Sequence, residues 1–176
     1  DAFTRATRID DSRAEAWLGA GNALQELDRY EESIAPLERA RSLQPDGPFI
    51  LNSLSTAKRR IGKLAESREL VEKALALKPN YPEALANLGS VLHSEGKVEE
   101  ARKTYEEALR RNPKIAPAHY NLALILRQSE PDLAIEHYRR VIEIEPKNDA
   151  AMLNLALLLE RQEKYTEAAE WLKRAT

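Results

Sequence analysis

The sequence predicts an all-α fold in which pairs of helices stack one after another in a linear array. The first observation is the spacing of four prolines, Pro45, Pro79, Pro113 and Pro146, which follow one another at intervals of 34, 34 and 33 residues. The second is that each interval holds two stretches with helical spacing of apolar residues, and the third is that small residues recur at equivalent positions. A period of this length is typical of stacked repeats that contact only their neighbours, rather than of one compact core.

The third repeat shows most clearly how each interval divides into two helices. Its first helix is expected at about residues 82–95, where Leu85, Leu88, Gly89 and Leu92 recur at i, i+3, i+4 and i+7. Its second is expected at about 98–111, with Ala101, Tyr105, Ala108 and Leu109 on one face. Gly96 supplies the turn between them, as Gly62 does one repeat earlier. On this alignment the chain is a single array of helix pairs. It comprises the end of a preceding repeat at 1–13, four full repeats at 14–47, 48–81, 82–115 and 116–148, and a truncated repeat at 149–176.

Prolines mark both ends of the expected helix pairs. Pro48 and Pro82 stand where a first helix begins, a position that needs no backbone N–H from the ring. The four regularly spaced prolines stand just past each second helix, which they prevent from continuing.

Small residues at fixed positions predict that the two helices of a repeat approach closely. One such position in the first helix holds Gly21, Ser55, Gly89, Ala123 and Ala156, and one in the second holds Ser33, Ser67, Ala101, Ala134 and Ala168. Two departures stand out. Lys58 takes a place where a large apolar residue is expected, so the second repeat should be the least well packed. The fourth repeat is one residue short around 129–133, so its inner turn should differ from the others.

The composition excludes several classes of function. With 27 basic and 29 acidic residues and a net charge of −2, the chain lacks the basic footprint of a nucleic-acid-binding protein. It has no cysteine, which excludes disulfides and cysteine-ligated zinc. No apolar run approaches the roughly 20 residues of a membrane span. Absence of cysteine fits either the cytoplasm or the periplasm, of which the cytoplasm is slightly favoured.

These features resemble the tetratricopeptide repeat (TPR). The residues that carry the resemblance in the third repeat are Leu85, Leu88, Gly89, Ala101, Tyr105, Ala108 and Pro113. The resemblance covers nearly the whole chain, and several repeats in phase make it specific. It implies a right-handed superhelical solenoid of antiparallel helix pairs, with the first helices lining a concave face where ligands usually bind.

The resemblance places a row of primary amides on this concave face. Asn87, Asn121 and Asn154 fall at equivalent positions, and Asn52 lies near the same face. A primary amide offers two donors and an acceptor, so it can bond both the N–H and the C=O of one residue in an extended peptide. We expect alanine at Asn87 and Asn121 to weaken peptide binding and to leave stability nearly unchanged.

Charged and apolar side chains complete the predicted groove. Its middle would be basic through Arg59, Arg60 and Arg127, with His93 beside them. Its far end would be apolar through Tyr120, Leu124, Leu153 and Leu157, and the combination suits a peptide with acidic and hydrophobic residues. The predicted peptide-binding residues are Asn52, Asn87, Asn121, Asn154, Arg59, Arg127, Tyr120 and Leu124.

The pattern of polar residues does not indicate an enzyme. His93 is expected on the inner surface, His119 in a packing position, and His137 on a second helix without an acidic partner at metal-binding spacing. We find no nucleophile, base and orienting group in a recognisable set, and no glycine-rich phosphate loop. The sequence therefore predicts no catalytic residue, no metal and no cofactor.

Three functions remain open from the sequence. The first is a scaffold that holds an extended segment of a protein partner in its groove. The second is the substrate-selecting, non-catalytic repeat region of a larger enzyme, such as a glycosyltransferase of the O-GlcNAc type. The third is end-to-end self-association. Both ends of the sequence fall in mid-repeat, with residues 2–9 resembling the end of a second helix, which favours a segment of a longer array.

Overall fold

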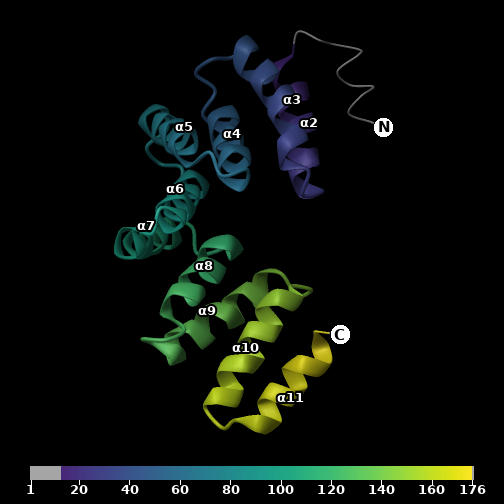
Figure 1. Cartoon of the computed structure of the whole chain (residues 1–176), viewed down its shortest axis with the longest axis vertical. Coiled ribbons are helices and arrows are strands. Elements are labelled where there is room, and N and C mark those ends of the chain that lie inside the picture. The colour runs from purple at the N-terminus through teal and green to yellow at the C-terminus, as the bar shows by residue number, and fades with distance from the viewer. Residues whose placement is uncertain (1–12, 176) are drawn as a thin grey trace. The chain divides into compact units, whose positions relative to one another are not determined.

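The computed structural model describes residues 13–175, which form ten α-helices and no strand (Figure 1). The predicted end of a preceding second helix, at residues 2–9, lies outside this range. In chain order the helices are α2 (Ala14–Glu26), α3 (Tyr30–Leu43), α4 (Pro48–Arg60), α5 (Leu64–Leu77), α6 (Pro82–Ser94), α7 (Val98–Arg111), α8 (Ala116–Leu126), α9 (Pro131–Ile144), α10 (Asp149–Arg161) and α11 (Tyr165–Arg174). The all-α prediction is confirmed.

The chain divides into two compact units, Asp1–Lys97 (unit 1) and Val98–Thr176 (unit 2). In unit 1 each helix from α2 to α6 packs against the next, and α4 also contacts both α2 and α6. In unit 2 each helix from α7 to α11 packs against the next. The even-numbered helices are the first helices of the predicted repeats, and the odd-numbered ones are the second helices.

The helices begin and end at prolines and at residues with left-handed backbone conformation, and the prolines and glycines stand where the sequence predicts. Pro48 and Pro82 are the first residues of α4 and α6. The second helices α3, α5, α7 and α9 each end two residues before one of the regularly spaced prolines. Gly62 and Gly96 take positive φ angles of 82° and 79° in the turns inside their repeats, a conformation that glycine adopts without steric cost. The residues at the equivalent turn of the first and last repeats, Asp28 and Glu163, take it as well.

The fourth repeat departs from this pattern, as its missing residue predicts. Its first helix, α8, has 11 residues, whereas α2, α4, α6 and α10 each have 13. A turn at 127–129 leads directly into α9, which begins at Pro131. The positive-φ residues of the described chain are Asp28, Gly62, Gly96 and Glu163, so this turn contains none.

The predicted small positions are buried and let the helices approach. A Cβ atom added to Gly21 on α2 would lie 2.4 Å from Cγ of Leu37 on α3, whose side chain is completely buried. Unit 1 has an apolar core that extends from α2 to α5, which includes Leu37, Leu51 and Leu54. In unit 2, Tyr105 and Tyr138 are fully buried at the position equivalent to that of Leu37. Close approach at the small position is thus matched by a large side chain opposite.

The second repeat buries more polar groups than expected for a core, and it satisfies them. Ser55 on α4 and Ser67 on α5 are fully buried, with their hydroxyl oxygens 2.9 Å apart, and Ser67 also donates to the carbonyl of Ser55 at 2.7 Å. Leu51 and Leu54 in the same repeat are at most 1% exposed. The expectation of looser packing in this repeat therefore finds no support in its burial.

Candidate peptide-binding surfaces

In unit 1 the predicted amides form a hydrogen-bonded chain between neighbouring first helices. Asn52 on α4 is only 8% exposed, and its Nδ2 donates to the hydroxyl of Tyr81 at 3.2 Å. Asn87 on α6 is half-buried, and its Nδ2 donates to Oδ1 of Asn52 at 2.8 Å and to Oγ1 of Thr56 at 3.0 Å. These bonds hold α4 and α6 in register and fix the orientation of the Asn87 amide.

The contacts change what the Asn87 amide can offer to a peptide. Both of its N–H groups are used within unit 1, whereas its Oδ1 accepts no hydrogen bond from the described residues. A peptide N–H could bond this oxygen directly, but a peptide carbonyl would have to displace Asn52 or Thr56. Asn87 can therefore bond both the N–H and the C=O of one peptide residue only after its own hydrogen bonds rearrange. Alanine at Asn87 would also remove its bonds to Asn52 and Thr56 within the fold.

Tyr81 and Thr56 also belong to this series of hydrogen bonds and were not predicted from the sequence. Burial raises the pKa of Tyr81 to about 12, so its hydroxyl stays protonated at neutral pH and accepts from Asn52. Phe49 packs edge-on against the Tyr81 ring, with ring centroids 5.2 Å apart, and the Lys78 ammonium lies over both rings. The signal that could have found Tyr81 is its position directly before Pro82, which is the N-cap position of α6, the helix that carries Asn87.

In unit 2 the equivalent surface is apolar. Asn154 on α10 donates through Nδ2 to the hydroxyl of Tyr120 on α8 at 3.1 Å and to the carbonyl of Ala150 at 2.8 Å. The same two helices carry four partly exposed apolar side chains at equivalent positions of their repeats, which we call the apolar face of unit 2. Its members are Tyr120, Leu124, Leu153 and Leu157. Tyr120 and Leu124 are half-buried, and the two leucines of α10 are 44% and 54% exposed.

The remaining predicted residues lie at several depths. Asn121 is half-buried on α8. Arg59 is half-buried in the last turn of α4, and Arg127 is exposed directly after α8. Both arginines thus lie at the carboxyl end of a first helix, where a positive charge is favoured by the helix dipole.

Two of the three histidines meet inside unit 2, which the sequence argument did not foresee. His119 on α8 is buried, as expected for a packing position, and its Nδ1 lies 2.8 Å from Nδ1 of His137 on α9. The other ring nitrogen of His119, Nε2, lies 3.1 Å from the carbonyl oxygen of Pro113. A carbonyl can only accept, so Nε2 of His119 carries the proton and its Nδ1 accepts from Nδ1–H of His137.

Both rings of this pair are uncharged at neutral pH, and the pair has a structural role. Burial lowers the pKa of His119, and burial together with the neighbouring His119 ring lowers the pKa of His137 to about 4.

A cavity of about 670 Å³ adjoins His119, between the α7–α8 loop and α9. Among the described residues, no group of three or more His, Cys, Asp or Glu side chains could hold a metal ion. His93 lies half-buried on α6, in unit 1.

Comparison with known proteins places the chain in a family. A family model described as tetratricopeptide repeat matches residues 1–48, 53–114, 95–149 and 126–176. The chain belongs to the TPR family. No curated protein gave a significant sequence match.

Solved structures of other TPR proteins share the fold. MamA is 25% identical, with 88% of this chain and 91% of MamA covered and a TM-score of 0.66. The thermophilic TPR protein TTC0263 of Thermus thermophilus is 23% identical, with 92% and 89% covered and a TM-score of 0.78. YrrB, described as a TPR protein with an unusual peptide-binding site, is 21% identical, with 99% and 91% covered and a TM-score of 0.59.

Family and fold together support a role as a protein–protein interaction scaffold. TPR repeats are typically non-catalytic scaffolds. Within the described range, none of the helices combines the length and the apolar character needed to cross a membrane.

Proposed function

We propose that this TPR protein holds an extended segment of a partner protein on the faces of its first helices. The contact residues in this proposal lie on α4, α6, α8 and α10 or directly after them. They are the residues predicted from the sequence, Asn52, Asn87, Asn121, Asn154, Arg59, Arg127, Tyr120 and Leu124, together with Leu153 and Leu157 of the apolar face of unit 2. The buried Asn52 acts by positioning Asn87.

The observation that carries the proposal is the apolar face of unit 2. Leu153 and Leu157 stand one helical turn apart on α10 and are about half exposed, beside Tyr120, whose hydroxyl is held by Asn154. An exposed group of large apolar side chains with an ordered polar neighbour is typical of a protein-binding site. YrrB, with its described peptide-binding site, is a precedent for peptide binding on this fold.

The polar chain of unit 1 supports a contact of a different kind. The fixed amide of Asn87 presents its oxygen, which can accept a backbone N–H whatever the side chain of the bound residue. The apolar face would then select hydrophobic residues of the partner, while the amide would contact the backbone without reading its sequence.

The test is a selection of binding peptides from a random extended-peptide library, followed by affinity measurements with charged variants. Leu153→Glu places a carboxylate on the apolar face and should weaken the selected peptides at least about tenfold, because a charge would be desolvated on binding. Leu77→Glu is the matched control, because Leu77 is 45% exposed on the second helix α5 and Leu153 is 44% exposed.

Asn87→Ala tests the amide in the same assay. Since this change also removes bonds to Asn52 and Thr56, its stability in urea is measured in parallel and the variant is compared under conditions where it is fully folded. Equal weakening by Leu153→Glu and Leu77→Glu, or a library that yields no binder, would contradict the proposal.

A further inference from the structure

A groove separate from the first-helix faces lies in unit 1 between α3 and α5, with α4 as its floor. Its volume is about 570 Å³, within the range of ordinary ligand pockets. Leu51 and Lys58 of α4 line the floor, Arg41 lines the α3 wall, and Glu66, Leu70 and Lys73 line the α5 wall. None of the residues proposed above to bind a peptide belongs to this lining.

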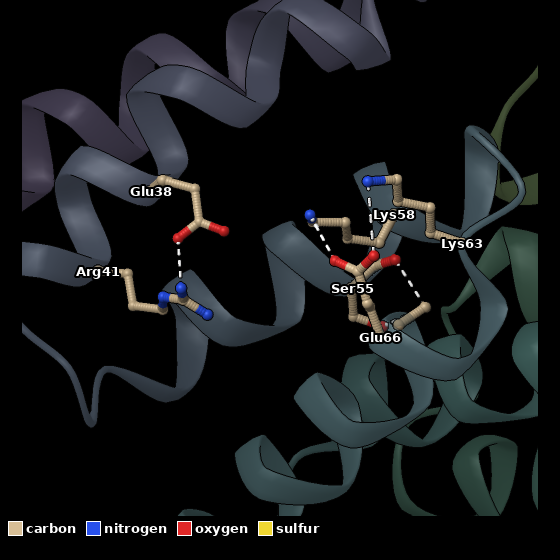
Figure 2. A network of polar contacts seen from close by, with 7 residues as sticks. Glu38, Arg41, Ser55, Lys58, Lys63 and Glu66 are labelled. Carbon is tan, nitrogen blue, oxygen red and sulfur yellow. Dashed lines mark hydrogen bonds and ion pairs between the residues drawn. The ribbon is translucent and has the colours of Figure 1, made fainter.

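The unusual residue of the groove is Lys58. Its equivalents in the other repeats, at the same 34- and 33-residue spacing, are Leu24, Leu92, Leu126 and Leu159. The Lys58 side chain is only 11% exposed, and its Nζ lies 2.6 Å from Oε2 of Glu66 (Figure 2). One repeat therefore exchanges a core leucine for an ammonium group at the floor of a groove, a change that costs stability unless the charge is paired.

The partner of this ammonium is a carboxylate at the rim. The side chain of Glu66 is 50% exposed, and its second oxygen lies 3.5 Å from Nζ of Lys63 (Figure 2). The hydrogen bond from Lys58 is the main cause of the lowered pKa of Glu66. Because Glu66 is half exposed and has Lys63 as an alternative partner, it can leave Lys58 without being left unpaired. When Glu66 leaves, the N–H groups of the Lys58 ammonium can donate to a ligand carboxylate instead.

The other charges of the groove do not select a ligand. Glu38, Glu66 and Glu69 balance Arg41, Lys58 and Lys73 within the lining. Arg41 pairs with Glu38 at 2.7 Å, and Lys73 pairs with Asp46 at 2.9 Å. These rim charges are exposed to water and salt, whereas the charge of Lys58 is buried and screened much less. The buried charge therefore decides which ligand the groove favours.

We propose that this groove is a second protein-binding site, which takes an aspartate or glutamate side chain of a partner segment with apolar neighbours. The ligand carboxylate bonds Lys58 in the place that Glu66 occupies in the free protein, and the apolar neighbours contact Leu51 and Leu70. Glu66 is thus an internal competitor that keeps the buried ammonium paired while the site is empty.

The experiment is a titration of the full chain followed by amide NMR shifts. The probe is the blocked peptide acetyl-Leu-Glu-Glu-Leu-amide, and its control is acetyl-Leu-Gln-Gln-Leu-amide, which has the same shape and no charge. Saturable shifts in the millimolar range are expected for residues 38–45, 51–58 and 66–73 with the acidic peptide only.

Three variants separate binding from structure. Lys58→Leu restores the residue of the other repeats and should weaken the acidic peptide about tenfold or more, since the buried charge is gone. Glu66→Gln removes the competitor and should tighten the peptide about threefold. Lys103→Met removes an exposed lysine of α7, outside the groove lining and without contact to Glu66, and should leave the affinity within about a factor of two.

The opposite directions of the first two variants exclude a purely structural ion pair. The proposal is overturned if the uncharged peptide binds equally well, if Lys58→Leu keeps the affinity, if Glu66→Gln does not raise it, or if the groove residues show no saturable shift. Urea unfolding checks that each variant is folded, and Lys58→Leu should be at least as stable as the wild type because a buried charge becomes apolar.

Discussion

Lowering the pH should weaken unit 2 at the His119–His137 pair well before the carboxylates of the chain are protonated. Nδ1–H of His137 donates to Nδ1 of His119, and Nε2–H of His119 faces the Pro113 carbonyl. A proton added to either ring would bring two N–H groups face to face at 2.8 Å or place a charge in a buried site. The folded state therefore resists protonation of both rings.

The sign and size of the effect follow from the pKa shifts. Burial is the main cause of both lowered pKa values, and that of His137 falls from 6.5 to about 4. Beside His137, the charge of Arg102 opposes protonation and that of Glu106 favours it. Beside His119, Arg140 opposes protonation and Glu143 favours it. Below about pH 6.5 the unfolded chain binds more protons than the folded one, so the free energy of unfolding falls as pH falls towards about 4.

The lowered pKa of His137 corresponds to about 3 kcal/mol over the whole window. Because the ring is half-buried, solvent screening reduces this figure, and we expect a loss of about 1–2 kcal/mol between about pH 7 and about pH 5. Carboxylates with lowered pKa values, such as Glu95 and Glu107, stabilise the fold above about pH 4.5 and lose this contribution only below it.

The assay is urea unfolding followed by far-ultraviolet circular dichroism at constant ionic strength across this pH range. The comparison is the double variant His119→Leu/His137→Leu, because the equivalent positions of other repeats hold leucine, at Leu51 and Leu70. The double variant should lose the pH dependence between about pH 5 and about pH 7, and the carboxylate contributions cancel in the difference. Parallel stability profiles for the wild type and the double variant would refute the reasoning.

Two further predictions concern packing. Gly21→Ala should lower the free energy of unfolding by about 1–3 kcal/mol, because its Cβ would lie 2.4 Å from Cγ of the fully buried Leu37. Urea unfolding measures this, and an unchanged stability would show that Leu37 moves aside. Tyr138→Phe should leave stability unchanged or raise it by up to about 1 kcal/mol, since the buried hydroxyl has no hydrogen-bond partner among the described residues. Thermal unfolding measures the change, and a clear loss of stability would mean that the hydroxyl has a partner such as a bound water.

The amino-acid sequence by itself determined the helix pairs, their turns and the positions of close packing. Each of these depends on local sterics or on the spacing of apolar residues along one helix. Proline begins a first helix at Pro48, glycine permits the left-handed turn at Gly62, and the small residue at Gly21 faces a large one at Leu37. Pro36 is an exception, because it lies inside α3 although proline disfavours a helix interior. The burial of Leu37 and Ala40 maintains the helix there.

The tertiary structure decided which polar side chains meet. Asn87 could be predicted on the first-helix face, but its bonds to Asn52 and Thr56 depend on how α6 packs against α4. His119 and His137 are 18 residues apart, and only the packing of α8 against α9 brings their rings together. The same holds for Lys58, which the sequence marks as unusual without showing that it reaches Glu66. The spacing of residues along the chain fixes the face of a helix on which a residue lies, whereas contacts between helices depend on their relative rotation and on the side-chain rotamers that packing selects.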